Sequence, residues 1–238
     1  MGRHRLSAIV SDYRRDKLRE ELASEWAVAL VYRPLALVVS WVLSGTAVRP
    51  NQITLAGLAL LPAMMAAAWF LSGFASLAVI AGLAVAFLVA DCVDGTIARL
   101  KGAESRLGRY LDASADLLFR AVAYGSFGLA MQRAGVAGIA AFGPFALALI
   151  AAWLALFART CREYSNTRFA LPATARARPW NWPDYLTAAL SGIDSLFPFL
   201  ALAAWLAGWP QAFIWWILIF SLLDLFATQR AILAGLRP

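Results

Sequence analysis

The sequence predicts an all-α integral membrane protein with six transmembrane helices and an N-terminal region of amphipathic helices lying in the membrane interface. Of its 238 residues 62% are hydrophobic and only 15% are charged, and the mean hydropathy is +0.68. A soluble domain would be roughly half apolar and about a quarter charged. Six apolar stretches reach the roughly 20 residues that a membrane-spanning helix needs. They are residues 52–72, 75–99, 108–132, 138–160, 184–207 and 211–233.

The residues before the first of these stretches are predicted to lie on the membrane. Residues 12–26 mix both charges with apolar residues four apart, which is typical of an interfacial helix. Residues 27–48 are apolar, but Arg33 and Pro34 interrupt them and leave a remainder that is short for a span. A true span over residues 27–48 is the competing interpretation. The predicted division is an interfacial segment, residues 1–50, and a six-helix transmembrane domain, residues 51–238.

The basic residues predict the orientation in the membrane. The chain has 21 Lys and Arg against 14 Asp and Glu, a formal charge of +7. With six spans and an internal N-terminus, 19 of the 21 fall in internal segments or in the helix ends beside them, and only Arg120 and Arg133 do not. Cytoplasmic loops are enriched in Lys and Arg. We therefore expect an inner-membrane protein with both termini in the cytoplasm, and its charge indicates contact with anionic lipids rather than nucleic acid.

Acidic residues gather at the cytoplasmic ends of the second and third predicted spans. Asp91 and Asp94 are three residues apart and Asp112 and Asp116 are four apart, so each pair shares a helix face. The short linker makes the two helices antiparallel neighbours, which brings both pairs to a similar depth. Four carboxylates this close need countercharge, and Mg²⁺ or Mn²⁺ would supply it. Two such ions would suit displacement at phosphorus, with the active site at the cytoplasmic face.

The spacing of these residues resembles a known family signature. From Asp91 to Asp116 the chain reads D-x₂-D-G-x₂-A-R-x₈-G-x₃-D-x₃-D, and all eight specified residues match the signature of CDP-alcohol phosphotransferases. The resemblance extends to the six-span layout and to residues 49–54 before the first span. It implies an enzyme of phospholipid synthesis that moves a phosphoalcohol group from a CDP-linked donor, most often CDP-diacylglycerol, to a small alcohol and releases CMP. It also implies a homodimer.

The resemblance assigns roles to individual residues. Asp116 is similar to the general base that deprotonates the acceptor hydroxyl. The residues similar to metal ligands, for two Mg²⁺ or Mn²⁺ ions, are Asp91, Asp94, Asp112 and Asp116. The residues expected around the donor nucleotide are Asn51, Thr54, Asp94, Gly95, Ala98, Arg99 and Gly108.

Three arginines are candidates for binding the acceptor. Arg120 lies one turn beyond Asp116, and Arg159 and Arg162 lie at the cytoplasmic end of the fourth span. Because a guanidinium binds phosphate in a fork, these residues suit a phosphorylated acceptor such as glycerol 3-phosphate or an inositol phosphate. Alternatively, Arg159 and Arg162 reach lipid headgroups, and Arg120 forms a salt bridge to Asp116 or Asp112. The acids Asp194 and Asp224 lie alone in the fifth and sixth spans, and we expect Asp224 to be structural.

Two other functions remain open at this point. A CDP-choline or CDP-ethanolamine donor with diacylglycerol as acceptor would use the same signature, because all these donors share the CDP half. Carboxylates in spans also mark cation transporters, which are not enzymes. A transporter, however, usually places its site at the membrane midplane between repeated halves, and here the acids lie at the rim and no repeat is evident.

Overall fold

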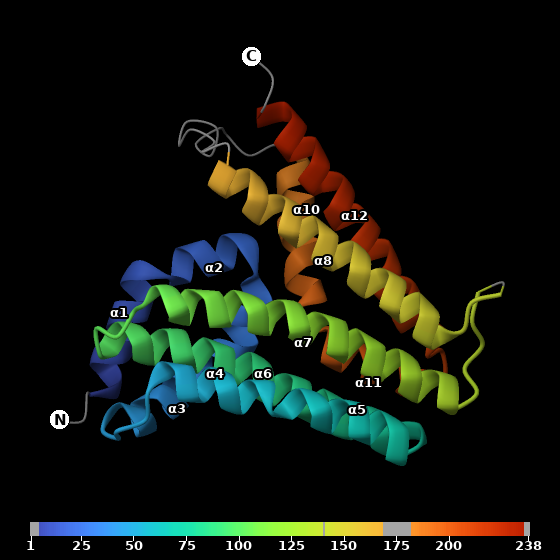
Figure 1. The fold of residues 1–238 in the computed structure, drawn as a ribbon, viewed down its shortest axis with the longest axis horizontal. Helices are drawn as coiled ribbons and strands as arrows, with labels where there is room; N and C mark the ends of the chain where they lie inside the picture. Colours follow the sequence, from blue (N-terminus) through green and yellow to red (C-terminus); the bar gives the residue numbers. More distant parts are fainter. Residues whose placement is uncertain (1–4, 140, 169–181, 236–238) are drawn as a thin grey trace.

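The computed structural model describes residues 5–139, 141–168 and 182–235, and these residues contain helices and no β-strand (Figure 1). The N-terminal helices are α1 (Leu6–Asp16), α2 (Leu18–Ser24), the π-helical turn η1 (Val28–Tyr32) and α3 (Arg33–Ser44). The remaining helices are α4 (Pro50–Leu58), α5 (Leu60–Phe70), α6 (Gly73–Leu100), α7 (Arg106–Arg133), α8 (Pro144–Arg168), α10 (Trp182–Asp194), α11 (Phe197–Leu206) and α12 (Gln211–Gly235). The predicted all-helical class is confirmed. Residues 169–181, between the fourth and fifth predicted spans, lie outside the described residues.

Four of the predicted spans are helices long and apolar enough to cross a membrane: α4 with α5, α6, the first 22 residues of α8, and α12. The third predicted span, α7, is one unbroken helix of 28 residues, but it carries charged side chains along its first half. The fifth, residues 184–207, is divided into α10 and α11 by a turn at Ser195 and Leu196. The count of six spans therefore stays a prediction.

The fourth predicted span begins later than expected, at Pro144 instead of residue 138. Residues 139 and 142 exchange backbone hydrogen bonds in a tight turn before the helix. A Cβ atom on Gly138 would lie 1.9 Å from the carbonyl oxygen of Phe142, so this turn requires glycine. Proline then begins the helix, where its missing N–H leaves no hydrogen bond unmade.

The N-terminal region differs from the expectation that Arg33 and Pro34 interrupt its apolar stretch. The π-helical turn η1 runs directly into α3, and Pro34 falls in the first turn of α3, where a helix tolerates proline. Residues 28–44 are a shorter apolar helix of 17 residues. The hydroxyl of Tyr32 donates to the carbonyl of Ser195 over 2.6 Å. The region is thus docked on the turn between α10 and α11.

The helices are arranged so that α6 and α7 lie side by side at the centre, flanked by α4 and α5 (Figure 1). Helix α8 packs against α7 on one side and α12 on the other. Helices α1 to α3 gather at the end of the molecule where α6 leads into α7. The short connection between α6 and α7 therefore lies next to the N-terminal region.

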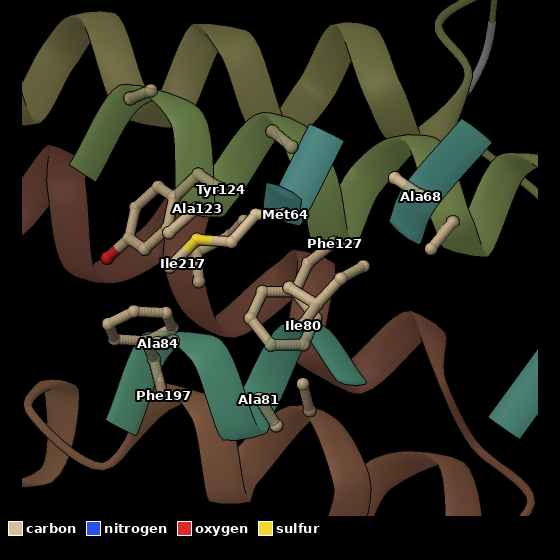
Figure 2. Close-up of a cluster of buried hydrophobic side chains, with 14 of the residues drawn as sticks. Met64, Ala68, Ile80, Ala81, Ala84, Ala123, Tyr124, Phe127, Phe197 and Ile217 are labelled. Carbon is tan, nitrogen blue, oxygen red and sulfur yellow. The ribbon is translucent and has the colours of Figure 1, made fainter. Parts of the chain in front are cut away.

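A hydrophobic core forms where α5, α6, α7, α11 and α12 meet (Figure 2). The labelled core residues are Met64, Ala68, Ile80, Ala81, Ala84, Ala123, Tyr124, Phe127, Phe197 and Ile217. Next to this core, small residues let α7 and α8 approach each other closely. A Cβ atom on Gly128 of α7 would lie 2.5 Å from the Cβ atom of Ala148 in α8. This close packing fixes α8 against α7, the helix that carries Asp112 and Asp116.

Candidate active site

Three carboxylates meet where α6 ends and α7 begins. Asp91 and Asp94 from α6 and Asp112 from α7 each offer an oxygen atom, and these oxygens lie within 4.8 Å of one another. Asp94 is only 5% exposed, whereas Asp112 is open to solvent. Three mutually repelling carboxylates with hard oxygen atoms fit a divalent cation such as Mg²⁺ or Mn²⁺, which would balance their charge. The predicted proximity of the two pairs is thus found for these three residues.

Two local features hold this cluster in place. The hydroxyl of Thr54, from α4, donates a hydrogen bond of 2.5 Å to Asp94 Oδ2, and Thr54 is itself buried. At the start of α7, the side chain of Ser105 caps the helix by accepting a hydrogen bond of 2.9 Å from the backbone N–H of Gly108. Helix α4 therefore orients one carboxylate, and the cap fixes where α7 begins.

A cavity of about 500 Å³ opens beside the carboxylates. A Cβ atom on Gly108 would approach Ser105 Oγ to 3.1 Å and Asn51 Oδ1 to 3.3 Å, so a larger residue would crowd the cavity wall. The cavity also reaches Asp112, which joins it to the carboxylate cluster. All seven residues predicted to surround the donor nucleotide line it: Asn51, Thr54, Asp94, Gly95, Ala98, Arg99 and Gly108.

Asp116, the predicted base, lies outside the group of three carboxylates. Its Oδ2 atom pairs with a terminal guanidinium nitrogen of Arg159 in α8, and about a quarter of its side chain is exposed. Arg159 also lines a second, smaller cavity of about 70 Å³. Asp116 is therefore connected through Arg159 to this second cavity.

The three predicted acceptor arginines, Arg120, Arg159 and Arg162, all line the second cavity, and each pairs with a carboxylate. Arg120 lies 2.6 Å from Asp194 Oδ2, and the hydroxyl of Tyr124 donates to the other oxygen of Asp194 over 3.0 Å. The alternative that Arg120 pairs with Asp116 or Asp112 is wrong. Its guanidinium extends toward α10, where Asp194 is only 2% exposed and needs a partner.

Arg162 has the same kind of arrangement on the other side of the cavity. Its Nη1 atom donates to Asp224 Oδ1 and to the hydroxyl of Thr228, both over 2.6 Å. Asp194 and Asp224, which stood alone in the sequence, are thus the partners of two predicted acceptor residues. The arrangement gives the cavity wall three guanidinium groups whose charges are already balanced.

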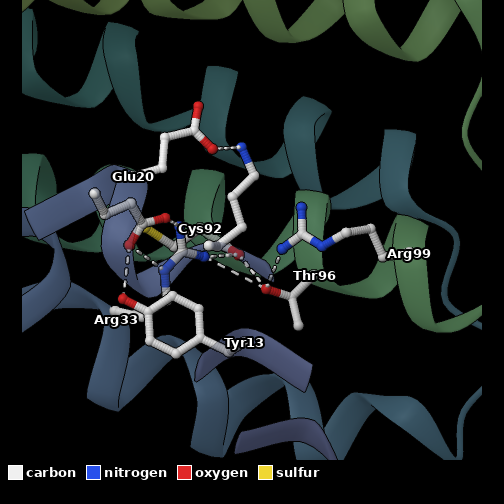
Figure 3. A network of polar contacts seen from close by, with 8 residues as sticks. Tyr13, Glu20, Arg33, Cys92, Thr96 and Arg99 are labelled. Atoms are coloured by element: carbon white, nitrogen blue, oxygen red, sulfur yellow. Dashed lines mark hydrogen bonds and ion pairs between the residues drawn. The ribbon is translucent and has the colours of Figure 1, made fainter. Parts of the chain in front are cut away.

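A buried polar network joins the N-terminal region to the turn of α6 that carries the cluster (Figure 3). Arg33 pairs with Glu21 and donates hydrogen bonds to the backbone carbonyl of Cys92 over 3.0 Å and to Thr96 Oγ1 over 3.4 Å. The hydroxyl of Tyr13 donates to Glu21 over 2.9 Å, and burial together with this bond raises the pKa of Tyr13. Because Cys92 lies between Asp91 and Asp94, Arg33 braces the helix turn that presents both.

The network also reaches the wall of the larger cavity. Arg99, the arginine of the signature, donates from Nη2 to Thr96 Oγ1 over 3.4 Å and lines the cavity. Thr96 in turn donates to the carbonyl of Cys92 over 2.8 Å. A continuous set of hydrogen bonds therefore runs from Glu21 to a residue of the predicted nucleotide site.

The sequence analysis missed three N-terminal residues that lie at these sites: Glu21, Arg33 and Glu25. One signal was present, because Arg33 is an ionisable residue inside an apolar stretch and such residues require a partner. No helix spacing relates Glu21 to Arg33, and nothing in the sequence distinguished Glu25, which lines the second cavity.

A comparison with known protein families gives a match that covers most of the chain. A family model described as CDP-alcohol phosphatidyltransferase matches residues 47–223, which include the signature, the carboxylate cluster and every residue that lines the larger cavity. Of the residues that line the second cavity, Glu25 and Asp224 lie outside the match. Helices α1 to α3 lie before the match. No curated protein matches the chain.

Proposed function

This chain belongs to the CDP-alcohol phosphatidyltransferase family, and from that premise we propose that it transfers a phosphatidyl group from CDP-diacylglycerol to the hydroxyl of an acceptor alcohol, with release of CMP. The family is one of transferases of substituted phosphate groups. One observation carries the proposal to this chain: the seven predicted nucleotide residues share a single cavity with the carboxylate cluster. Membership of this family favours transfer over the cation-transporter alternative.

In the proposed donor complex, the cytidine diphosphate half lies in the larger cavity. Gly95, Ala98 and Gly108 leave space along the wall for the nucleotide, and Arg99 faces the same space as a fixed positive charge for the diphosphate. The lipid half would extend along the apolar helices into the membrane. CDP-choline or CDP-ethanolamine with diacylglycerol remains the alternative pair of substrates.

Asp91, Asp94 and Asp112 would hold the divalent ions, with Asp116 as a fourth ligand. Bound Mg²⁺ or Mn²⁺, as one or two ions, would stabilise negative charge on the diphosphate oxygens. Thr54 keeps the carboxylate of Asp94 oriented toward the cluster. The donor's negative charge would otherwise be repelled by these three acids.

Asp116 would act as the general base. The acceptor oxygen attacks the lipid-side phosphorus, the bond from that phosphorus to the bridging oxygen breaks, and CMP leaves with the bridging oxygen. The proton of the acceptor hydroxyl passes to Asp116. Arg159, which pairs with Asp116, supports this role because it holds the carboxylate at the edge of the second cavity.

The second cavity is the proposed acceptor site. Arg120, Arg159 and Arg162 have further N–H groups beyond those in their ion pairs, and these could bind a phosphate on the acceptor. Glycerol 3-phosphate and inositol phosphates are the acceptors that fit this chemistry. We further propose an inner-membrane location with both termini and the site on the cytoplasmic side, supported by the positions of 19 of the 21 basic residues. A homodimer is proposed from the family resemblance alone.

Purified protein in detergent with Mg²⁺ and CDP-diacylglycerol tests the function. Each of glycerol 3-phosphate, inositol 1-phosphate, inositol, serine and choline is supplied in turn, and CMP release and lipid product are both measured. We expect equal amounts of CMP and new lipid, and the highest rate with a phosphorylated acceptor. Turnover only with CDP-choline or CDP-ethanolamine and diacylglycerol would favour the alternative, and no turnover of any CDP-linked donor would refute the proposal.

A further inference from the structure

Four carboxylates lie at the three arginines of the second cavity when Asp116, the partner of Arg159, is counted. Arg120, Arg159 and Arg162 are paired with Asp194, Asp116 and Asp224 respectively. Glu25 lines the same cavity, yet within the part of the chain that the structure describes its carboxylate makes no hydrogen bond or ion pair. A carboxylate has about four positions for accepting hydrogen bonds. Glu25 is therefore a hydrogen-bond acceptor presented to whatever occupies the cavity.

The backbone and the neighbouring side chain hold Glu25 in this position. Its N–H donates to the carbonyl of Glu21 over 2.8 Å at the end of α2. The indole N–H of Trp26, the next residue, donates to the carbonyl of Ala189 in α10 over 3.2 Å. A Cβ atom on Gly192 would lie 2.0 Å from the indole nitrogen, so α10 admits Trp26 only because residue 192 is glycine. The placement of Glu25 is thus built into the contact between α2 and α10.

The surroundings of Glu25 supply positive charge but leave its hydrogen bonds unmade. The side chain of Glu25 is exposed and faces the second cavity, and the protein packed around its carboxylate raises the pKa of Glu25 by desolvation. The nearby guanidinium groups of Arg120 and Arg159 act in the opposite direction. A carboxylate that faces the cavity can accept hydrogen bonds from a bound molecule, and a neutral hydroxyl group donates one without adding charge beside the arginines. Two serine residues, Ser191 and Ser195, complete the polar wall.

We propose that Glu25 selects the acceptor by accepting a hydrogen bond from a second hydroxyl group, next to the hydroxyl that reacts at Asp116. The acceptor is then a polyol with at least two hydroxyls, and its phosphate is bound by the arginines. This inference rests on the proposed function and narrows its substrate class. Glu25 lies before the residues that match the family, so the selection is a feature of this chain's N-terminal region.

The test compares two acceptors that differ in one hydroxyl group: glycerol 3-phosphate, with two hydroxyls, and 2-hydroxyethyl phosphate, with one. Serine serves as a third acceptor whose extra donor is an ammonium group. The variants are Glu25→Ala, Glu25→Gln and, as a matched control on the exposed side of α2, Glu20→Ala. The readouts are kcat/KM for each acceptor and the KM of CDP-diacylglycerol.

We expect Glu25→Ala to lower kcat/KM for glycerol 3-phosphate by roughly 10- to 150-fold, the range for one hydrogen bond to a charged group. The kcat/KM for 2-hydroxyethyl phosphate and the KM of CDP-diacylglycerol should stay unchanged. Glu25→Gln should recover part of the loss, because its amide oxygen still accepts from a hydroxyl. Gly192→Ala, which displaces Trp26 and with it Glu25, should lower the same kcat/KM.

An equal loss with both phosphorylated acceptors would show a merely structural role and overturn the inference. A loss confined to serine, with no recovery in Glu25→Gln, would show that Glu25 binds an ammonium group and would also overturn it. Normal CMP release with unchanged acceptor preference in every Glu25 variant would refute the inference alone. Absence of CMP release in the parent protein with every acceptor would refute the proposed function and the inference with it.

Discussion

Replacing Arg33 by Met should destabilise the protein far more than a typical loss of one charge. The side chains of Arg33 and Glu21 are only 10% and 14% exposed. Met can fill much of the space of the arginine stem, so the main effect is an unpaired buried carboxylate. Removing one partner of a buried ion pair costs about 3–5 kcal/mol. We expect the free energy of unfolding to fall by about that amount.

Two variants provide the comparison. Arg15→Met breaks the pair of Arg15 with Asp12, whose side chains are 71% and 49% exposed, and it should change the free energy of unfolding by about 0–1 kcal/mol. The double variant Glu21→Leu with Arg33→Met leaves neither charge buried, so it should recover most of the stability lost in the single variant.

The assay is equilibrium unfolding in detergent micelles, followed by the affinity for Mn²⁺ in the presence of CDP. Arg33 also holds the carbonyl of Cys92 between Asp91 and Asp94. The double variant should therefore regain stability while its metal affinity stays below that of the parent. The reasoning would be refuted if Arg33→Met were no less stable than Arg15→Met, or if the double variant bound Mn²⁺ as tightly as the parent.

Four further predictions concern the reaction and the orientation in the membrane. A chelator should abolish turnover and added Mg²⁺ or Mn²⁺ should restore it; full turnover in excess chelator would exclude a metal at the cluster. Asp116→Asn should retain donor binding in calorimetry but lower kcat by roughly 10²- to 10⁴-fold. Asp91→Asn should instead weaken donor binding. An equal loss of donor binding in both variants would make Asp116 primarily a metal ligand. Arg162→Ala should raise the acceptor KM roughly 10- to 150-fold and leave the donor KM unchanged; equal changes in both would indicate a structural role. In a cysteine-free background on intact cells, Asp12→Cys should not react with a membrane-impermeant thiol label, and Arg133→Cys should react. Labelling of Asp12→Cys would support a span over residues 27–48.

The carboxylate cluster could be predicted because its spacing is local. Residues three or four apart share a helix face wherever the helix lies, and a short linker forces two helices to be neighbours. Asp91, Asp94 and Asp112 accordingly meet as expected. The nucleotide residues came from the family resemblance. All but Asn51 and Thr54 belong to the same pair of helices, so their proximity to the cluster is also local.

The partners of the arginines could not be predicted, because they are set by how distant helices pack. Arg120 and Asp194 are 74 residues apart, and Arg162 and Asp224 are 62 apart. Their contacts depend on where α10 and α12 lie against α7 and α8, which no periodicity encodes. The same limit applies to α2, whose amphipathic pattern predicted a membrane surface but not the contact with α10 that places Glu25 at the second cavity.

The most direct test of phosphatidyl transfer is to follow the phosphorus atoms of the donor. CDP-diacylglycerol labelled with ³²P only in the lipid-side phosphate is turned over by the purified protein in Mg²⁺ with the preferred acceptor. If the acceptor hydroxyl attacks that phosphorus, as proposed, all the label appears in the new lipid and the released CMP is unlabelled. Label in a released nucleotide, or in inorganic phosphate, would contradict the account.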